Sequence, residues 1–286
     1  MSDCADEWQV ARRRKGAARK SKPLPVCAVS SCQHERVDVK KSVKRITDTV
    51  AELRCEHMLK DWTDHLLAAA SSLPTAIPGN KEHKERTSAQ HLECVCFGLG
   101  SFSTCISARY QLALLLLLLD AGQIDLQNCF LYDPVFSPAE QDVLRELGLT
   151  VLTENEEGKR LVTRPTLFYL MHCGKALYNN LLWRNWSLER LSSLVIIGNS
   201  FSGMTERAID REFKQDYSYI SQAAGWCEER LLSCPSRLSD VFGDTSLISF
   251  PACSLNGLPQ SMWAEPSEPQ YQNCSDLEII LRDTQS

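Results

Sequence analysis

Short apolar runs separated by polar turns and helical stretches set the pattern of the central part of the chain. The first run, Cys94 to Phe97, has no helical periodicity, which is typical of a strand covered on both faces of a parallel sheet. Gly98-Leu99-Gly100 closes the run, and Ser101 offers a hydroxyl that can cap the following helix. That helix contains the leucine run from Leu112 to Leu119, which we expect in the middle of the core.

The alternation of strand-like and helix-like segments continues towards the C-terminus. Further strands are predicted at residues 128–132, 149–152, 166–171, 194–197 and 247–250. Ser137-Pro138 begins a helix, with serine as the cap and proline at the first position, and residues 175–183 and 213–232 have helical character. Strands that alternate with helices indicate an α/β fold, here a three-layer Rossmann-like open, mostly parallel sheet with helices on both faces.

Composition divides the chain into four segments. Residues 1–40 lack apolar periodicity, so we expect a disordered basic arm there. Residues 41–90 begin with an amphipathic helix that packs on the outside of the core domain and continue as a charged linker. Residues 91–251 form the Rossmann-like core domain. Residues 252–286 are rich in Ser, Pro, Gln and Asn, which predicts a largely disordered tail; its DLEIILRD stretch could dock as a short helix.

Overall composition fits a soluble, mostly globular protein with one sizeable domain. The 286 residues are 43% hydrophobic and 23% charged, with a formal net charge of -5. A mildly acidic chain has no global electrostatic reason to coat nucleic acid, so we expect no direct nucleic-acid binding. The leucine run is shorter than the roughly 20 apolar residues that cross a bilayer, and no secretory signal is visible. With 13 cysteines in a chain of this kind, we expect a reducing, cytoplasmic location and no membrane association.

Positive charge is concentrated in one run, from Arg12 to Lys22. Small and polar residues surround it, so we interpret it first as part of the solvated, disordered arm. A nuclear-targeting segment is the second interpretation, which would add the nucleus to the expected location.

Polar residues follow several of the predicted strands. Because the carboxyl ends of parallel strands share one edge of an open sheet, and ligands bind there at a topological switch point, these residues predict a small-molecule pocket. The candidate ligand-binding residues are Gly98, Gly100, Ser101, Asp133, His172, Asn199 and Ser200.

The chemistry of this pocket stays open at the level of sequence. A dinucleotide fingerprint is not supported, because residue 103 is serine and Asp133 lies more than 30 residues beyond Gly98, where about 20 is usual. A methyltransferase-like or degenerate Rossmann-type pocket is one alternative. The other needs no ligand: the glycines permit a tight strand-to-helix turn, and Asp133 caps a turn with Pro134. His172 and Cys173 are adjacent and point to opposite faces of a strand, so they do not form a nucleophile pair. We assign no catalytic residue and no metal site, and the sequence leaves the cofactor unknown.

Five stretches in order resemble the sensitivity-to-red-light-reduced family, and its animal members in particular. They are CFGLGSFSTCISARYQLALLLLLLD, YDPVFSPAE, LGLTVLTENEEGK, PTLFYLMHCGKALYNNLLWRNW and VIIGNSF, and the match covers roughly Glu93 to Phe201. Residues at the family's signature positions include Gly98, Gly100, Ser101, Tyr110, Gln111, Asp133, Pro134, Glu140, Asn155, His172, Cys173, Asn179, Asn180, Asn199 and Ser200.

This resemblance implies a regulator and carries over no catalytic residue. Members of the family are linked to circadian core-clock gene expression, in animals also to haem biosynthesis, and in fungi to microtubule stability. We therefore expect a regulatory protein that acts through protein partners of unknown identity, with a small ligand at the carboxyl edge of the sheet. The alternative is an uncharacterised Rossmann-type enzyme that depends on S-adenosylmethionine or a nucleotide.

Overall fold

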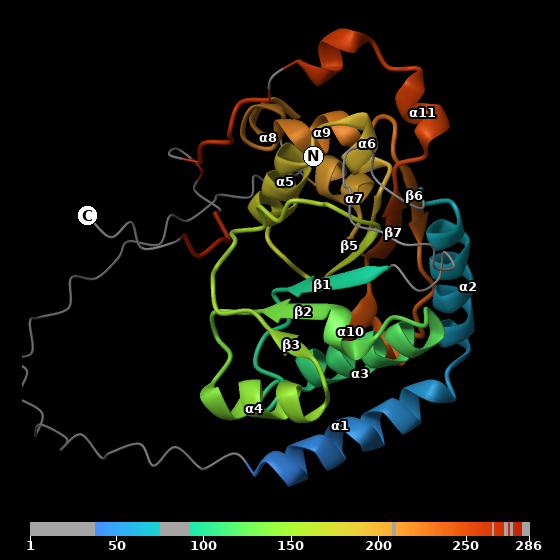
Figure 1. Cartoon of the computed structure of the whole chain (residues 1–286), viewed down its shortest axis with the longest axis vertical. Helices are drawn as coiled ribbons and strands as arrows, with labels where there is room; N and C mark the ends of the chain where they lie inside the picture. The colour runs from blue at the N-terminus through green and yellow to red at the C-terminus, as the bar shows by residue number, and fades with distance from the viewer. Residues whose placement is uncertain are drawn as a thin grey trace, which may run out of the picture. The chain divides into compact units, whose positions relative to one another are not determined.

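A seven-stranded sheet forms the centre of the protein (Figure 1). The computed structural model describes residues 38–74, 92–207, 210–264, 266–271, 274 and 277–281. The strands are β1 Glu93–Phe97, β2 Cys129–Tyr132, β3 Thr150–Val151, β4 Thr166–Leu170, β5 Leu194–Asn199, β6 Glu228–Leu231 and β7 Thr245–Ser249. Their order is β3-β2-β1-β4-β5-β7-β6. β1 to β5 are parallel, whereas β7 runs antiparallel to both of its neighbours, β5 and β6. The predicted α/β fold with a mostly parallel sheet is confirmed.

Helices cover both faces of the sheet (Figure 1). The helices on one face are α1 Val39–Arg54, α2 His57–Ser71, α3 Ile106–Ala121, α4 Pro138–Glu146 and α10 Ser239–Phe242. Those on the other are α5 Lys175–Arg184, α6 Leu188–Leu191, α7 Phe201–Glu206, α8 Asp210–Asp216, α9 Ser218–Ala223 and α11 Ala252–Asn256. Short 3-10 helices are η2 Leu126–Asn128, η3 Ser236–Leu238 and η4 Gln260–Trp263. Each face of the sheet therefore has its own hydrophobic cluster.

Strand β1 shows why the central strands read as continuous apolar runs. Cys94 and Cys96 belong to the cluster under α3, and Val95 and Phe97 belong to the cluster under α5. All four side chains are buried. Since successive side chains of a strand point to opposite faces and both faces are covered, no position along β1 can be polar without cost. Helix α3 lies directly on this sheet and is apolar nearly all round.

The single amphipathic helix predicted from residue 41 is in fact two helices. Cys55 ends α1 in a helical conformation, but Glu56 is extended, with φ -81° and ψ 135°, and serves as the N-cap of α2. The break changes the direction of the chain, so that α1 and α2 cross α3 along different paths (Figure 1). As a result Trp62 is fully buried, and its indole N–H donates to the carbonyl of Ser233 at 2.7 Å.

The C-terminal third differs most from expectation. Residues 213–232, predicted as helical, form parts of two short helices and then β6, an edge strand whose residues Glu228, Glu229 and Arg230 give no apolar signal. Residues 252–286 were expected to be a largely disordered tail, yet Leu255 is buried and Trp263 packs against Trp186. The DLEIILRD stretch has no helix over its described residues 277–281.

Two expectations concern segments outside the described residues. The first is the basic arm, expected over residues 1–40: residues 1–37 are not described, and α1 begins at Val39. The second is the linker expected before β1, of which residues 75–91 are not described. Within the part of the chain that the structure describes, no helix combines the length and the apolar character that crossing a membrane requires.

The burial of α3 predicts a graded response to truncation of its leucines. Leu115 is fully buried in the core cluster, whereas its neighbour Leu116 is only partly buried. Leu115→Ala should lower the free energy of unfolding by about 2–5 kcal/mol, because it removes buried methyl groups and leaves a cavity. Leu116→Ala removes the same atoms and serves as the matched control, with a smaller expected loss. Urea unfolding of both variants measures the difference, and equal losses would contradict this packing.

Candidate functional site

The turn after β1 depends on its glycines. Gly98 and Gly100 have φ values of +66° and +80°, a left-handed conformation that side chains other than glycine rarely adopt. A Cβ atom at Gly98 would also lie 2.6 Å from Sγ of Cys173, which follows β4. The turn therefore brings the carboxyl ends of β1 and β4 into direct contact, at the point where the strand order reverses direction.

Asp133, which follows β2, is hydrogen-bonded to the glycine turn. Its Oδ2 accepts a hydrogen bond from the backbone N–H of Gly100 at 2.8 Å, and its Oδ1 accepts from the N–H of Val135 at 2.9 Å. In a nucleotide-binding turn the amides face the ligand. Here the Gly100 amide is directed to a carboxylate of the protein itself.

Glu140 engages the rest of the same turn. Its Oε1 accepts from the Ser103 N–H at 3.0 Å, the Ser103 hydroxyl at 2.9 Å and the Ser101 hydroxyl at 2.8 Å. Its Oε2 accepts from the N–H and the hydroxyl of Ser137, completing the capping box of α4. Burial would raise the pKa of Glu140, but these hydrogen bonds outweigh it and hold the pKa below its ordinary value. A buried carboxylate thus joins the β1–α3 turn to α4.

The ends of β4 and β5 are joined by His172 and Asn199. His172 has a φ of +53°, which is uncommon outside glycine, and its N–H donates to Oδ1 of Asn199 at 2.9 Å. Nε2 of the same histidine lies 2.9 Å from the carbonyl of Val241 in α10. Ser200 caps α7, since its hydroxyl accepts from the N–H of Gly203 at 2.8 Å. These residues fasten neighbouring loops to one another.

A cavity of about 340 Å³ opens at the ends of β1, β2 and β4. Of the residues predicted from the sequence, Gly98, Asp133 and His172 line it. Gly100, Ser101, Asn199 and Ser200 are not among its lining residues. The structure therefore brings the predicted residues to one sheet edge but places only part of them at the cavity.

Much of the cavity wall comes from residues that sequence reasoning did not select. The loop between β3 and β4 contributes Asn155, Glu156, Glu157 and Gly158, and the far C-terminal segment contributes Glu278, Ile279 and Ile280. The first group had a visible signal, a polar turn that ends in glycine. The second had only the apolar residues of DLEIILRD, in a segment expected to be largely disordered.

Carboxylates dominate the polar lining. Asp133, Glu156, Glu157 and Glu278 are among the residues that line it. Arg160 pairs with Oε1 of Glu156 at 2.8 Å, and Lys159 pairs with Oε2 of Glu157 at 2.7 Å. Oε2 of Glu156 is buried and has no hydrogen-bond partner among the described residues. An acceptor of this kind fits a ligand that donates hydrogen bonds or carries positive charge, and the acidic surroundings oppose a phosphate.

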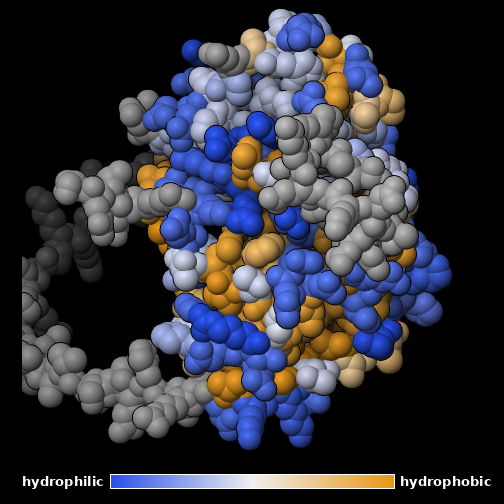
Figure 2. Space-filling model, in the orientation of Figure 1, coloured by the Kyte–Doolittle hydropathy of each residue, from blue (hydrophilic) through white to orange (hydrophobic). Residues whose placement is uncertain are grey.

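Apolar groups border the same cavity. Val135 and Ile280, two of its lining residues, are 54% and 59% exposed. Figure 2 shows hydrophobic surface interleaved with hydrophilic residues on the side towards which β1 and β2 point in Figure 1.

Cys173 also lines the cavity. Its thiol donates to the carbonyl of Phe97 at 3.2 Å, and burial raises its pKa well above the ordinary range. A buried, protonated thiol is a weak nucleophile. Across the described residues, no group of three or more His, Cys, Asp and Glu side chains could hold a metal ion.

Comparison with known proteins identifies the family. Residues 56–259 match the family model of the SRR1 domain, which spans α2 to α11 and includes the whole sheet. The chain belongs to the SRR1 family. It is similar to the SRR1-like protein of Mus musculus, with 39% identity over 230 residues that cover 74% of this chain and 91% of the mouse protein.

Two other relatives extend the comparison. The SRR1-like protein of Drosophila melanogaster is 30% identical over 289 residues, covering 98% of this chain and 92% of the fly protein. The Arabidopsis thaliana protein SENSITIVITY TO RED LIGHT REDUCED 1 is 38% identical over 120 residues, covering 42% of this chain and 44% of the plant protein.

Several residues that matched the family signature have structural partners in this SRR1 domain. Gln111 donates through Nε2 to the carbonyl of Val241 at 3.3 Å, and Tyr110 donates to Oε2 of Glu52 in α1 at 2.7 Å. Asn180 donates to the carbonyl of Glu157 at 2.8 Å, which fixes the acidic loop against α5. Tyr110 and Gln111 thus join α3 to α1 and α10, and Asn180 holds a residue that lines the cavity.

Replacing Glu140 should destabilise the protein in a pH-dependent way. In Glu140→Gln the amide NH₂ faces hydroxyl and N–H donors, so we expect a loss of about 1–3 kcal/mol in the free energy of unfolding at pH 7. Because the folded pKa is lowered, the contribution of the carboxylate is present above its unfolded pKa and is lost as pH falls through the folded pKa. The difference from wild type should therefore narrow below about pH 4.

The matched control for this prediction is Glu146→Gln. Glu146 lies on the same helix, α4, but is exposed. Denaturant unfolding at several pH values compares the two variants. A stability of Glu140→Gln equal to that of the control at pH 7 would contradict a structural role for the carboxylate.

Proposed function

We propose that this SRR1-family protein is a regulator that acts in haem biosynthesis and in circadian core-clock gene expression. It acts through protein partners, and a small ligand bound in the cavity at the carboxyl edge of the sheet sets its activity. Membership of the SRR1 family supports the regulatory role, as does the printed name of the Arabidopsis relative, which refers to sensitivity to red light and not to a reaction.

The unpartnered carboxylate oxygen of Glu156 is the observation that carries the ligand part of this proposal. A buried acceptor without a donor is costly in an unliganded protein, and a ligand hydroxyl or cationic group would satisfy it. Phosphate is disfavoured, since the turn amide of Gly100 is bound to Asp133 and that of Ser103 to Glu140. A nucleoside-like compound without phosphate groups fits these charges better than a nucleotide.

An enzyme that depends on S-adenosylmethionine is the second candidate. The first five strands follow the doubly wound order 3-2-1-4-5, with the cavity at the carboxyl ends of β1, β2 and β4. The sulfonium and amino groups of S-adenosylmethionine would suit the acidic wall. Strand order alone supplies no chemistry, so regulation remains the first proposal.

Calorimetric titration separates these possibilities. We expect S-adenosylmethionine or adenosine to bind the wild-type protein more tightly than ATP does, because the cavity is acidic. Glu156→Gln should weaken that binding about tenfold or more, as expected from a charge-assisted hydrogen bond of about 1.5–3 kcal/mol. Glu146→Gln, which leaves the cavity untouched, is the control. Equal affinity of wild type and Glu156→Gln would remove Glu156 from the ligand site, and tighter binding of ATP would contradict the charge argument.

A rescue experiment tests the regulatory role. Cells that lack the protein should show altered haem content and altered core-clock transcript rhythms, and the wild-type chain should restore both. Glu156→Gln should restore neither fully if ligand binding sets the activity, whereas Glu146→Gln should restore both. Normal haem and normal rhythms in the absence of the protein would contradict the proposed role.

A further inference from the structure

The far C-terminal residues lie against the cavity. Residues 277–281, which we call the strap, are extended and form neither helix nor strand. Glu278, Ile279 and Ile280 line the cavity, and Nδ2 of Asn155 donates to the carbonyl of Ile280 at 2.6 Å. On the opposite side Gly174 approaches the strap so closely that an added Cβ would lie 2.6 Å from the carbonyl oxygen of Glu278. The strap therefore closes one side of the cavity.

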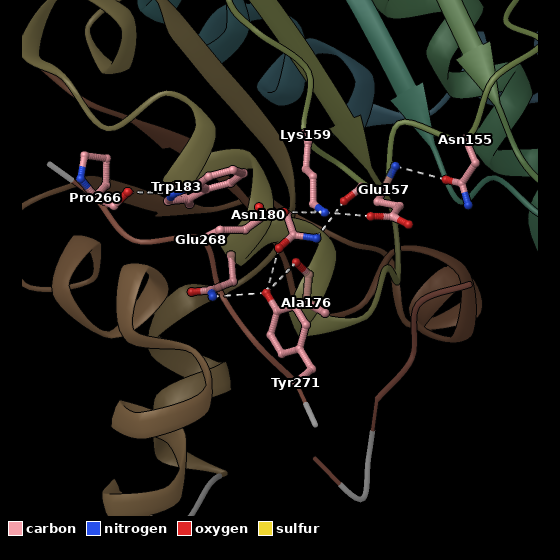
Figure 3. A network of polar contacts seen from close by, with 10 residues as sticks. Asn155, Glu157, Lys159, Ala176, Asn180, Trp183, Pro266, Glu268 and Tyr271 are labelled. Carbon is pink, nitrogen blue, oxygen red and sulfur yellow. Dashed lines mark hydrogen bonds and ion pairs between the residues drawn. The ribbon is translucent and has the colours of Figure 1, made fainter. Parts of the chain in front are cut away.

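The segment before the strap is held firmly, mostly through its main chain. Trp186 donates to the carbonyl of Met262 at 2.9 Å, Trp183 to that of Pro266 at 3.1 Å, and Tyr219 to that of Ser267 at 2.8 Å. In Figure 3 the indole of Trp183 faces Pro266 in this way, and Lys159 extends towards Glu157. Lys159 also pairs with Glu268 at 2.7 Å, which links the acidic loop to the tail.

Tyr271 and Cys274 anchor the chain just before the strap, and Sγ of Cys274 lies 2.9 Å from the hydroxyl of Tyr217. The hydroxyl of Tyr271 donates to Oδ1 of Asn180 at 2.8 Å and receives a hydrogen bond from Nδ2 of Asn179 at 3.1 Å (Figure 3). Burial raises its pKa above the ordinary range, so the hydroxyl stays protonated and can donate. The strap itself is held less tightly, with Ile280 59% and Leu281 55% exposed. Release of the strap would leave the upstream anchors in place.

We propose that the strap is a built-in cover of the sheet-edge cavity, and that its docking and ligand binding oppose each other. The docked strap places Glu278 to Ile280 in the cavity wall, and its release opens that wall to solvent. By thermodynamic linkage, a ligand that needs the open cavity lowers the occupancy of the docked strap, and a docked strap lowers the affinity for the ligand by the same factor. The ligand part of this inference rests on the proposed function; the closing of the cavity does not.

Gly174 offers a way to release the strap without straining the chain. Its φ of -63° and ψ of 150° are open to any residue, so alanine is compatible with the backbone. The Cβ atom of an alanine at position 174 would collide with the strap. It would lie 2.5 Å from Cβ and 2.6 Å from the carbonyl oxygen of Glu278. Gly174→Ala should therefore push the strap away while leaving the N-cap geometry of α5 intact.

Asn155→Asp gives an independent release. Oδ1 of Asn155 accepts from the N–H of Glu157 at 3.0 Å, and aspartate keeps that acceptor. Aspartate has no N–H to donate to the carbonyl of Ile280. Its second carboxylate oxygen would instead face that carbonyl oxygen and repel it. Gly225→Ala is the control, because its Cβ would come no closer than 3.4 Å to another atom and its φ lies outside the left-handed range. Faster hydrogen exchange of residues 277–281 in both variants, but not in the control, verifies release.

Opening of the cavity is measured without any ligand by alkylation of Cys173. This thiol lines the cavity and is buried, whereas Cys253 is exposed and serves as the internal reference in peptide mass spectrometry. We expect Gly174→Ala and Asn155→Asp to raise the labelling rate of Cys173 relative to Cys253 about two- to tenfold, the range that loss of one hydrogen bond implies. Released straps with unchanged labelling of Cys173 would overturn the inference.

Titration with S-adenosylmethionine as the probe completes the test. Tighter binding to Gly174→Ala than to wild type and Gly225→Ala supports the opposition between strap and ligand. Asn155→Asp adds a carboxylate to the cavity wall, so its affinity counts only where Gly174→Ala shows the same change. Equal affinity in all four proteins overturns it, while the proposed ligand site survives. If labelling of Cys173 rises but neither S-adenosylmethionine nor adenosine binds any of the four, the strap remains a cover and the proposed ligand fails.

Discussion

Burial of the sheet on both of its faces is the constraint on which the other features depend. When helices cover both faces, the interior strands must be apolar along their length, and their main-chain polar groups are satisfied by the neighbouring strands. Chemistry is then confined to the strand ends. There the turn amides leave the ladder and need acceptors, and the side chains that follow β1, β2, β4 and β5 are the first polar groups available to them.

In this protein, side chains of the same chain accept the hydrogen bonds of these turn amides. Asp133 and Glu140 take the donors of the β1–α3 turn, and Asn199 takes the N–H of His172. A buried carboxylate with five donors around it is stable because the hydrogen bonds replace the water that it lost. One consequence is that the turn is rigid and already occupied, so a phosphate has no free amides to bind there. The cavity beside it is lined by several carboxylate residues, which favours a different class of ligand.

The sequence could predict the sheet because periodicity and burial agree in β1, β2, β4 and β5. It could predict that Asp133, His172 and the glycines share an edge, since the ends of parallel strands must. It could not predict that Gly100 and Ser101 would be bound to carboxylates of the same chain, because Glu140 comes from a helix whose orientation depends on tertiary packing. β6 has no apolar pattern, and it forms because its main chain pairs with β7 through hydrogen bonds. The strap was missed for a similar reason. Its hydrogen bond to Asn155 uses the main-chain carbonyl of Ile280, which any sequence carries, and Leu277 and Ile279 pack on a cluster formed by distant parts of the chain.

The two edges of the sheet bear on how the protein behaves at high concentration. An exposed strand presents unpaired N–H and C=O groups, which is a template for the strands of other molecules. β3 is only two residues long, and β6 places Glu228, Glu229 and Arg230 in succession on the opposite edge. Any strand that adds to β6 would have to accommodate this row of charges. The same run of charges that hides β6 from sequence-based prediction therefore opposes edge-to-edge aggregation of the folded protein.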